Sequence, residues 1–351
     1  MTKRNPKFAS RRTFLKLAGA GIAAPALLRA TYTVAAEPIT YVGWGGAAQE
    51  VAEKIFIKPF MAETGIQVQV VNGPDLAKAK GQVDSGQIEW DVMDLAGDVM
   101  AGGEKADLFA ELPKGLFPSQ DELTLPTRKS GVPYMQYAGV MAYSPSRAGD
   151  KYPRTFKDFF DGQALPGRRG MRTFVGEQLE MALLADGVAP ASLYPLDVDR
   201  GFKSLDKVKP FVAKWIDQTQ QTISLLQNNE IDFSYTYNGR VEKARQSGVD
   251  VDFSRDQALI LTEYLAVLKG SPRIDNAMKF IAYYLNPERQ AQFSEAYNAI
   301  PVVKAAFPLV KPEVIARLPD VKNPANVVLN DSWWLDRQIE LVRRFKEWLA
   351  T

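Results

Sequence analysis

The chain of 351 residues contains no histidine and no cysteine. These absences exclude Ser-His-Asp and Cys-His nucleophilic catalysis, zinc held by histidine or cysteine, iron–sulfur clusters and disulfides, because each needs atoms that the chain lacks. Catalysis by serine with lysine, or by paired carboxylates, stays chemically open, but no spacing of residues supports either. We therefore expect no enzyme and no cofactor, with a hydrolase or lyase as the remote alternative.

A run of apolar residues long enough to span a bilayer is also absent. The apolar stretch at 17–28 has 12 residues and follows a basic region without an acidic residue. Val34, Ala35 and Ala36 form a small-residue cleavage site, so we expect 1–36 to be a signal segment and the mature chain to begin at Glu37.

The signal segment contains Ser10-Arg11-Arg12-Thr13-Phe14-Leu15-Lys16, which closely resembles a twin-arginine export signal. A general secretory signal with a chance arginine pair is the alternative, and the Phe-Leu-Lys after the pair favours the twin-arginine route. No cysteine follows the apolar stretch, so a lipid anchor of the bacterial lipoprotein type is not expected. These features predict a soluble protein in the periplasm of a Gram-negative bacterium.

Positive charge is concentrated in this segment, which holds seven cations and no acidic residue. Its removal changes the formal net charge from +2 to −5. A mildly acidic mature chain has lost the main electrostatic support for nucleic-acid binding, so we expect no nucleic-acid partner.

The mature chain opens with strands and helices in alternation, which predicts a parallel sheet with right-handed crossovers. Strands are expected at 39–42, 66–71 and 90–95, and helices at 48–63 and 78–85. After a proline-containing loop region, two long apolar β runs at 132–144 and 258–268 bracket a second set of elements. Between the runs we expect helices at 155–160, 178–185 and 199–227, the last broken at Pro210, and strands at 170–172 and 231–237. After them we expect helices at 274–285, 287–297 and 332–350.

The two long runs predict two lobes joined by two strands, with a ligand cleft between the lobes. The glycines of Gly43-Trp44-Gly45-Gly46 would let a ligand approach the backbone where the first strand ends. They lack the spacing of a dinucleotide-binding fingerprint.

The stretch from Phe233 to Arg240 predicts a second part of the ligand site. Its alternating strand ends at Asn238-Gly239, a pair typical of turns, and Arg240 follows at the start of a helical pattern. An aromatic residue and an arginine at such a corner suit stacking on a ligand and capture of its carboxylate. The alternative is a surface arginine after an ordinary turn.

Several motifs together resemble one protein family along nearly the whole mature chain. They are Trp44-Gly45-Gly46, Lys58-Pro59-Phe60-Met61-Ala62-Glu63-Thr64-Gly65-Ile66, Trp90-Asp91-Val92, Phe156-Lys157-Asp158-Phe159-Phe160-Asp161, Pro166-Gly167-Arg168-Arg169-Gly170, Leu179-Glu180-Met181-Ala182-Leu183-Leu184-Ala185-Asp186-Gly187, Tyr194-Pro195-Leu196-Asp197, Tyr237-Asn238-Gly239-Arg240 and Trp333-Trp334. In this order they resemble the extracellular solute-binding proteins of ABC importers, of the spermidine/putrescine type.

The resemblance implies an α/β chain with the two-lobed type II periplasmic-binding fold, in which two mainly parallel sheets are joined by crossing strands. We expect one lobe from 37–143 and 264–305, and the other from 144–263 and 306–351. The expected partners are a small-molecule ligand and an inner-membrane ABC permease, and we expect a monomer.

The resemblance also implies site residues, position by position. Trp44 matches an aromatic that stacks on the ligand, and Tyr237 and Tyr297 match aromatics along the cleft. Glu177 and Glu263 match carboxylates that meet an amine.

Three departures concern the charge of the site. The acidic and hydroxyl residues that commonly follow the first aromatic are here Gly45, Gly46 and Ala47, and Ala96-Gly97-Asp98 replaces a Ser/Tyr contact loop. Arg240 stands where the putrescine-binding members place an aspartate.

Arg240 and Glu263 together suit a small zwitterion, such as a γ-aminobutyrate-like ω-amino acid or an aminophosphonate. A diamine would face an uncompensated arginine at a cost of several kcal/mol, about the penalty of an unpaired buried charge. The alternative is that Arg240 pairs with Glu177 or Glu263 and leaves a polyamine site; another small solute is the third possibility.

Three other patterns are given structural interpretations. Tyr283-Tyr284 is similar to the tyrosine pair of ferric-ion-binding relatives, but lies in a helical pattern and predicts one core and one surface residue. Of Asp91 and Asp94, we expect one to cap a turn and the other to be solvated, rather than a catalytic pair. Trp333-Trp334 is expected to pack in the core of a lobe.

Overall fold

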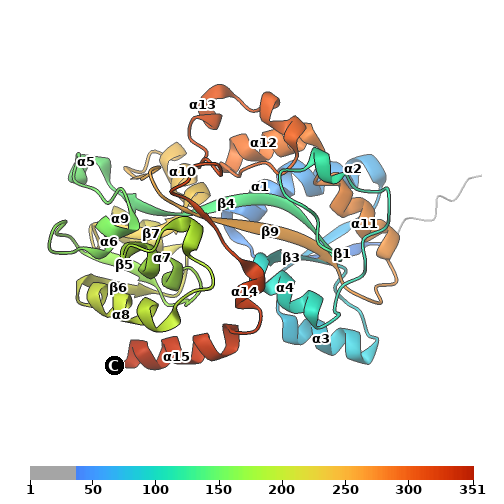
Figure 1. The fold of residues 1–351 in the computed structure, drawn as a ribbon. Helices are drawn as coiled ribbons and strands as arrows, with labels where there is room; N and C mark the ends of the chain where they lie inside the picture. Colours follow the sequence, from blue (N-terminus) through green and yellow to red (C-terminus); the bar gives the residue numbers. More distant parts are fainter. Residues whose placement is uncertain (1–36) are drawn as a thin grey trace, which may run out of the picture. The chain divides into compact units, whose positions relative to one another are not determined.

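A mixed sheet of ten strands runs through residues 37–351, the part of the chain that the computed structural model describes. The predicted signal segment lies outside the described residues. Eight strands follow the order β2-β1-β3-β9-β4-β7-β5-β6, while β8 pairs with β4 and β10 pairs with β9 (Figure 1). Their bounds are β1 Ile39–Gly43, β2 Val68–Asn72, β3 Val92–Ala96, β4 Gly131–Tyr143, β5 Arg169–Arg172, β6 Val212–Ile216, β7 Phe233–Tyr237, β8 Asp252–Phe253, β9 Leu259–Val267 and β10 Val327–Val328.

The sheet has two parallel sections with two long antiparallel strands between them. Strand β1 pairs in parallel with β2 and β3, and β5 pairs in parallel with β6 and β7. Strands β4 and β9 pair with each other over most of their length and connect these sections. The α/β class and the two long strands are confirmed, and the strands join both parallel sections into one hydrogen-bonded sheet.

Helices cover the sheet, and their ends follow local capping rules. A continuous helical segment consists of α1 Gly46–Ala52, the π-helical turn Glu53–Ile57 and α2 Lys58–Thr64. It ends at Gly65, which has a φ of 75° and closes the last turn in the left-handed conformation. The other helices are α3 Leu76–Ser85, α4 Gly97–Lys105, α5 Pro145–Ala148, α6 Phe156–Phe160, α7 Gln178–Ala185, α8 Val198–Val208, α9 Gln221–Gln227, α10 Asn238–Gln246, α11 Ile274–Tyr283, α12 Pro287–Tyr297, α13 Pro312–Ile315, α14 Asp331–Trp334 and α15 Gln338–Ala350.

Two large apolar clusters include residues from opposite ends of the two long strands β4 and β9. One takes its residues from 39–135 and 265–306, and the other from 141–261 and 327–345. This division is close to the expected lobes, whose boundaries stay a prediction. No helix within residues 37–351 is both long enough and apolar enough to cross a bilayer.

The predicted helix at 199–227 is wrong for 209–220, while α9 at Gln221–Gln227 confirms its last part. Helix α8 ends at Val208, a 3-10 turn at Lys209–Phe211 follows, and β6 then pairs with β5. Pro210 has no N–H to continue the helix. The side chains of β6 are exposed or half-buried except Ile216, so this strand lacked the apolar signal of a buried one.

The predicted turn at Asn238-Gly239 is also wrong, because both residues belong to α10. The Asn238 side chain accepts a hydrogen bond from the backbone N–H of Ala138 and donates to the Asn298 carbonyl. A Cβ atom at Gly239 would lie 2.6 Å from the Tyr297 ring. Tertiary contacts therefore account for the helical conformation of this pair, whose residue types are typical of turns. The closing helix predicted at 332–350 is likewise two helices, α14 and α15.

Candidate functional site

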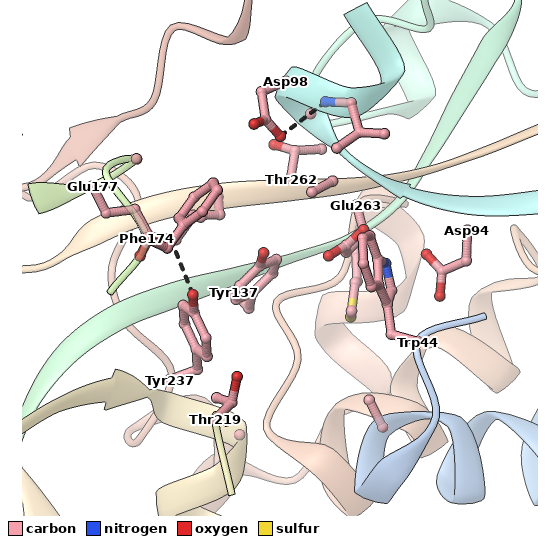
Figure 2. Close-up of a pocket in the computed structure, with 18 of the residues that line it drawn as sticks. Trp44, Asp94, Asp98, Tyr137, Phe174, Glu177, Thr219, Tyr237, Thr262 and Glu263 are labelled. Atoms are coloured by element: carbon pink, nitrogen blue, oxygen red, sulfur yellow. Dashed lines mark hydrogen bonds between the residues drawn. The ribbon is translucent and has the colours of Figure 1, made fainter. Parts of the chain in front are cut away.

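A cavity of about 520 Å³ lies against the middle of the sheet and is lined by residues from both parallel sections and both long strands. All seven residues predicted to bind a ligand line it: Trp44, Asp98, Glu177, Tyr237, Arg240, Glu263 and Tyr297. Figure 2 shows Trp44, Asp94 and Glu263 toward one end and Glu177 and Tyr237 toward the other, with Tyr137 between them. The structure thus brings the predicted residues together, while their binding role stays a prediction.

Trp44 follows β1 directly, and its side chain is 49% exposed. The next residue, Gly45, has a φ of 75°, and its N–H donates to Gln49 Oε1 at 2.8 Å. This left-handed backbone is easy for glycine and costly for other residues. The loop thereby places the Trp44 indole at the cavity wall, and the two glycines that follow add no side chain there.

Glu177 is a buried acceptor for two tyrosines of β7. The hydroxyl of Tyr237 donates to Glu177 at 3.0 Å, and the hydroxyl of Tyr235 donates to its other carboxylate oxygen. Burial raises the pKa of Glu177 to about 7, while the Tyr235 hydroxyl, the nearby Arg172 and the Tyr237 hydroxyl act in the opposite direction. Glu177 therefore orients Tyr237 in the cavity wall.

Arg240 lies in the first turn of α10 and is half-buried. Within residues 37–351 its side chain makes no hydrogen bond and no ion pair, so the alternative pairing with Glu177 or Glu263 is not observed. Burial raises the pKa of Tyr297. Arg240 lowers this pKa and Glu263 raises it, so both charges act on the same tyrosine. Arg240 thus offers its guanidinium to the same cavity that Glu263 lines.

Glu263 projects from β9 and is only 6% exposed. Its Oε2 atom has no hydrogen-bond partner among the described residues. Burial raises the pKa of Glu263 well above its usual value, and the neighbouring Asp94 raises it further. A buried carboxylate without a cation is costly, so the position suits a charge that arrives with a ligand.

Sequence reasoning missed three charged residues and two aromatics that line the cavity: Asp94, Arg172, Asp331, Trp334 and Tyr137. Arg172 donates to the carbonyls of Ile216 and Asp217, and its Nη1 atom has no partner within the described chain. Burial raises the pKa of Asp331 to about 7, with the nearby Asp98 as the next cause. Asp331 and Trp334 come from α14, and no local sequence signal connects that segment to the cavity.

Asp91 and Asp94 are both buried, so the expectation that one of them is solvated is wrong. Asp91 accepts from Arg273 Nε at 2.9 Å and from the Ser271 hydroxyl at 2.5 Å. Asp94 instead lines the cavity and accepts from two tyrosines. A charged residue inside an apolar strand was the signal that would have identified Asp94.

The remaining patterns have mainly structural roles. Tyr284 is fully buried and stacks on Phe56, while Tyr283 is half-buried, which confirms one core and one more exposed tyrosine. Trp333 and Trp334 both pack in the second apolar cluster, as predicted. Trp334 also donates from Nε1 to Glu180 at 2.7 Å and reaches the cavity wall. Within residues 37–351, no group of three or more acidic residues has an arrangement that would hold a metal ion.

The chain belongs to the bacterial extracellular solute-binding proteins, whose family pattern it matches over residues 56–323. Proteins of this class bind a small molecule and deliver it to the permease of an ABC importer. The fold, with a ligand-sized cavity against two long central strands, agrees with this membership.

The chain is also similar to individual solute-binding proteins. The chain is 33% identical to a γ-aminobutyric acid-binding protein of Pseudomonas aeruginosa, over 90% of this chain and 91% of that protein. It is 23% identical to a putrescine/agmatine-binding protein of the same organism, over 72% and 76%. A solved GABA receptor is similar with a TM-score of 0.82 and 31% identity, covering 89% of this chain and 97% of that one. An ABC transporter substrate-binding protein of Bradyrhizobium japonicum has a TM-score of 0.83 and 32% identity, covering 90% and 99%.

Proposed function

We propose that this protein captures a small ω-amino acid of the γ-aminobutyrate type and delivers it to an inner-membrane ABC permease. One observation carries the proposal: Arg240 and Glu263 line the same cavity, and neither is paired with an opposite charge within residues 37–351. A zwitterion places a carboxylate against one and an ammonium against the other. The greater similarity to γ-aminobutyrate-binding than to polyamine-binding relatives supports this choice.

The carboxylate end is formed by the two arginines of the cavity wall. The planar guanidinium of Arg240 suits two parallel hydrogen bonds to a carboxylate. Arg172 adds a second positive charge and a buried Nη1 atom that is free to donate. An aminophosphonate would satisfy the same donors.

Aromatic residues line the middle of the proposed site, and an aromatic and an acidic residue line the end that would hold the ammonium group. The rings of Tyr137 and Tyr237 meet edge to face, with centroids 5.3 Å apart, and form an apolar wall for a short carbon chain. The Trp44 indole offers a face to the ammonium, which Glu263 neutralises.

A polyamine is the second candidate, and the surplus of carboxyl groups in the cavity favours it. Asp98 and Asp331 line the wall in addition to Glu177 and Glu263. A diammonium ligand would still leave Arg240 and Arg172 facing positive charge. We therefore place polyamines behind ω-amino acids.

Family membership supports a role in transport, and the proposal also covers lobe closure, oligomeric state, export route and the chemical fate of the ligand. We propose that the segments 37–143 with 264–305 and 144–263 with 306–351 are lobes that close on the ligand. We also propose that the mature chain acts as a monomer in the periplasm, is exported by the twin-arginine route without a lipid anchor, and returns its ligand chemically unchanged.

Calorimetric titration of residues 37–351 tests the ligand class. We expect γ-aminobutyrate to bind at least about tenfold more tightly than putrescine or spermidine, a difference of about 1.4 kcal/mol. Butyrate and butylamine, which each lack one charge, serve as matched controls and should bind weakly. Tight putrescine binding without γ-aminobutyrate binding would contradict the zwitterion proposal, and a changed ligand recovered from the complex would contradict pure transport.

A further inference from the structure

Asp94 and Glu263 project toward the same part of the cavity from adjacent strands. In the antiparallel pairing of β3 with β9, Glu263 lies opposite Ala96, while Asp94 lies opposite Leu265. The two acidic residues are therefore diagonal neighbours on one face of the sheet, close enough for long side chains to meet. Figure 2 shows them together beside Trp44.

Both carboxyl groups are buried, and each has an unused oxygen. Asp94 and Glu263 are each 6% exposed, and both line the cavity. The Asp94 Oδ1 and Glu263 Oε2 atoms have no hydrogen-bond partner within residues 37–351. The other Asp94 oxygen accepts from the hydroxyls of Tyr41 and Tyr134, both at 3.0 Å. The tyrosines thus hold Asp94 in place and leave one oxygen for a ligand.

We propose that Asp94 and Glu263 together form the ammonium subsite, that they share one proton when the cavity is empty, and that a primary ammonium group displaces this proton on binding. The inference rests on the proposed amine-bearing ligand and deepens it, because it adds a specificity residue and a proton to the binding equilibrium. Two buried carboxylates cannot both ionise at low cost without a nearby cation.

The groups around the pair supply hydrogen bonds and aromatic faces. Those with a described contact or electrostatic effect on it are Tyr41 from β1, Tyr134 and Tyr137 from β4, Tyr284 at the end of α11, Asp98 from α4 and Tyr297 from α12. Asp98 raises the pKa of Glu263 further, and Arg240 lowers the pKa of Tyr297, which burial raises. Within residues 37–351, neither Asp94 nor Glu263 forms an ion pair.

Proton affinity follows from this geometry. Burial raises the pKa of Asp94 to about 7, and the hydrogen bonds from Tyr41 and Tyr134, together with the neighbouring Glu263, act against the increase. Burial also raises the pKa of Glu263 well above its usual value, with the charge of Asp94 as the next cause. The proton belongs to the pair rather than to one residue.

The exchange balances without any co-reactant. The ligand arrives as –NH3+, its N–H groups donate to the two carboxylates, and the O–H proton of the pair leaves to solvent. No covalent bond of the ligand changes. Because the empty pair holds a proton below its raised pKa, affinity should be constant at high pH and fall as pH decreases through that range.

The first test counts protons. Titrating γ-aminobutyrate in buffers with different ionisation enthalpies at pH 7 should show release of up to one proton per ligand. In Asp94→Asn the amide oxygen can still accept from Tyr41 and Tyr134, so folding should be retained. We expect this variant to bind at least about tenfold more weakly at pH 8, to release fewer protons, and to lose affinity only at lower pH. Asp84→Asn, at an exposed position, is the matched control.

Putrescine is titrated in parallel, because it also carries a primary ammonium. If putrescine binds and γ-aminobutyrate does not, the proposed ligand fails, while proton release with putrescine still tests the pair. Carbon-13 NMR titration of the side-chain carboxyls in the empty protein gives a measurement without ligand. It should show one carboxyl of the pair titrating near or above neutral pH. Ordinary carboxyl pKa values for both residues, or unchanged affinity and proton release in Asp94→Asn, would overturn the proposal.

Discussion

Replacing Arg240 with alanine is expected to weaken γ-aminobutyrate binding by about 30-fold or more, because loss of one partner from a buried charge pair costs about 2–5 kcal/mol. The guanidinium lines the cavity and has no partner of its own within residues 37–351, so its hydrogen-bonding capacity is available to the ligand carboxylate. Calorimetric titration measures the loss. Putrescine has no carboxylate, and its affinity should stay the same or increase.

Two further variants separate charge from geometry at this position. Arg240→Lys keeps the charge but not the planar pair of donors, so it should bind with intermediate affinity. Arg240→Asp presents an acid instead and should favour putrescine over γ-aminobutyrate. Lys243→Ala, in the same helix and away from the cavity lining, is the matched control. If Arg240→Ala retains wild-type affinity, Arg240 is not the carboxylate clamp.

Replacing Asp91 with alanine is expected to lower the free energy of unfolding by about 3 kcal/mol, the lower end of the cost of breaking a buried ion pair. Asp91 is fully buried, and besides Arg273 and Ser271 it accepts from the backbone N–H of Thr40 at 2.7 Å. The substitution leaves these donors without their acceptor. Urea denaturation followed by circular dichroism measures the change in midpoint.

The exposed pair of Asp84 with Lys80 provides the comparison for Asp91. Both side chains are more than half exposed, so Asp84→Ala should leave the midpoint nearly unchanged. Ligand affinity should also be retained in Asp91→Ala at low temperature, because Asp91 does not line the cavity. Equal midpoints for Asp91→Ala and Asp84→Ala would show that the buried pair adds nothing to stability.

The sequence predicted elements well where local chemistry decides them. Helix α7 at Gln178–Ala185 and helix α12 at Pro287–Tyr297 have the predicted bounds. In α12, Asn286 caps the N-terminus and proline occupies the first turn, which are local signals. Prediction failed where contacts distant in sequence determine the conformation. At Asn238-Gly239 these are the hydrogen bond from the Ala138 N–H to Asn238 and the close packing of Gly239 against Tyr297.

The same distinction applies to the candidate site. Trp44, Glu263 and Arg240 were expected from strand ends, charge and family resemblance, and all three line the cavity. Asp94 and Asp331 were not expected, because their approach to the cavity depends on strand register and on how α14 returns across the sheet. A single sequence carries no local record of how α14 returns, and the only local sign of Asp94 was a charged residue inside an apolar strand.

The exposed indole of Trp44 gives this protein an internal optical reporter. Trp44 is the most exposed of the six tryptophans, and it lines the cavity. A ligand or a closing lobe that covers the ring would transfer it from water to a less polar surrounding and shift its fluorescence to shorter wavelength. Binding can therefore be followed by emission in dilute, unlabelled protein, with Trp44→Phe as the spectroscopic blank.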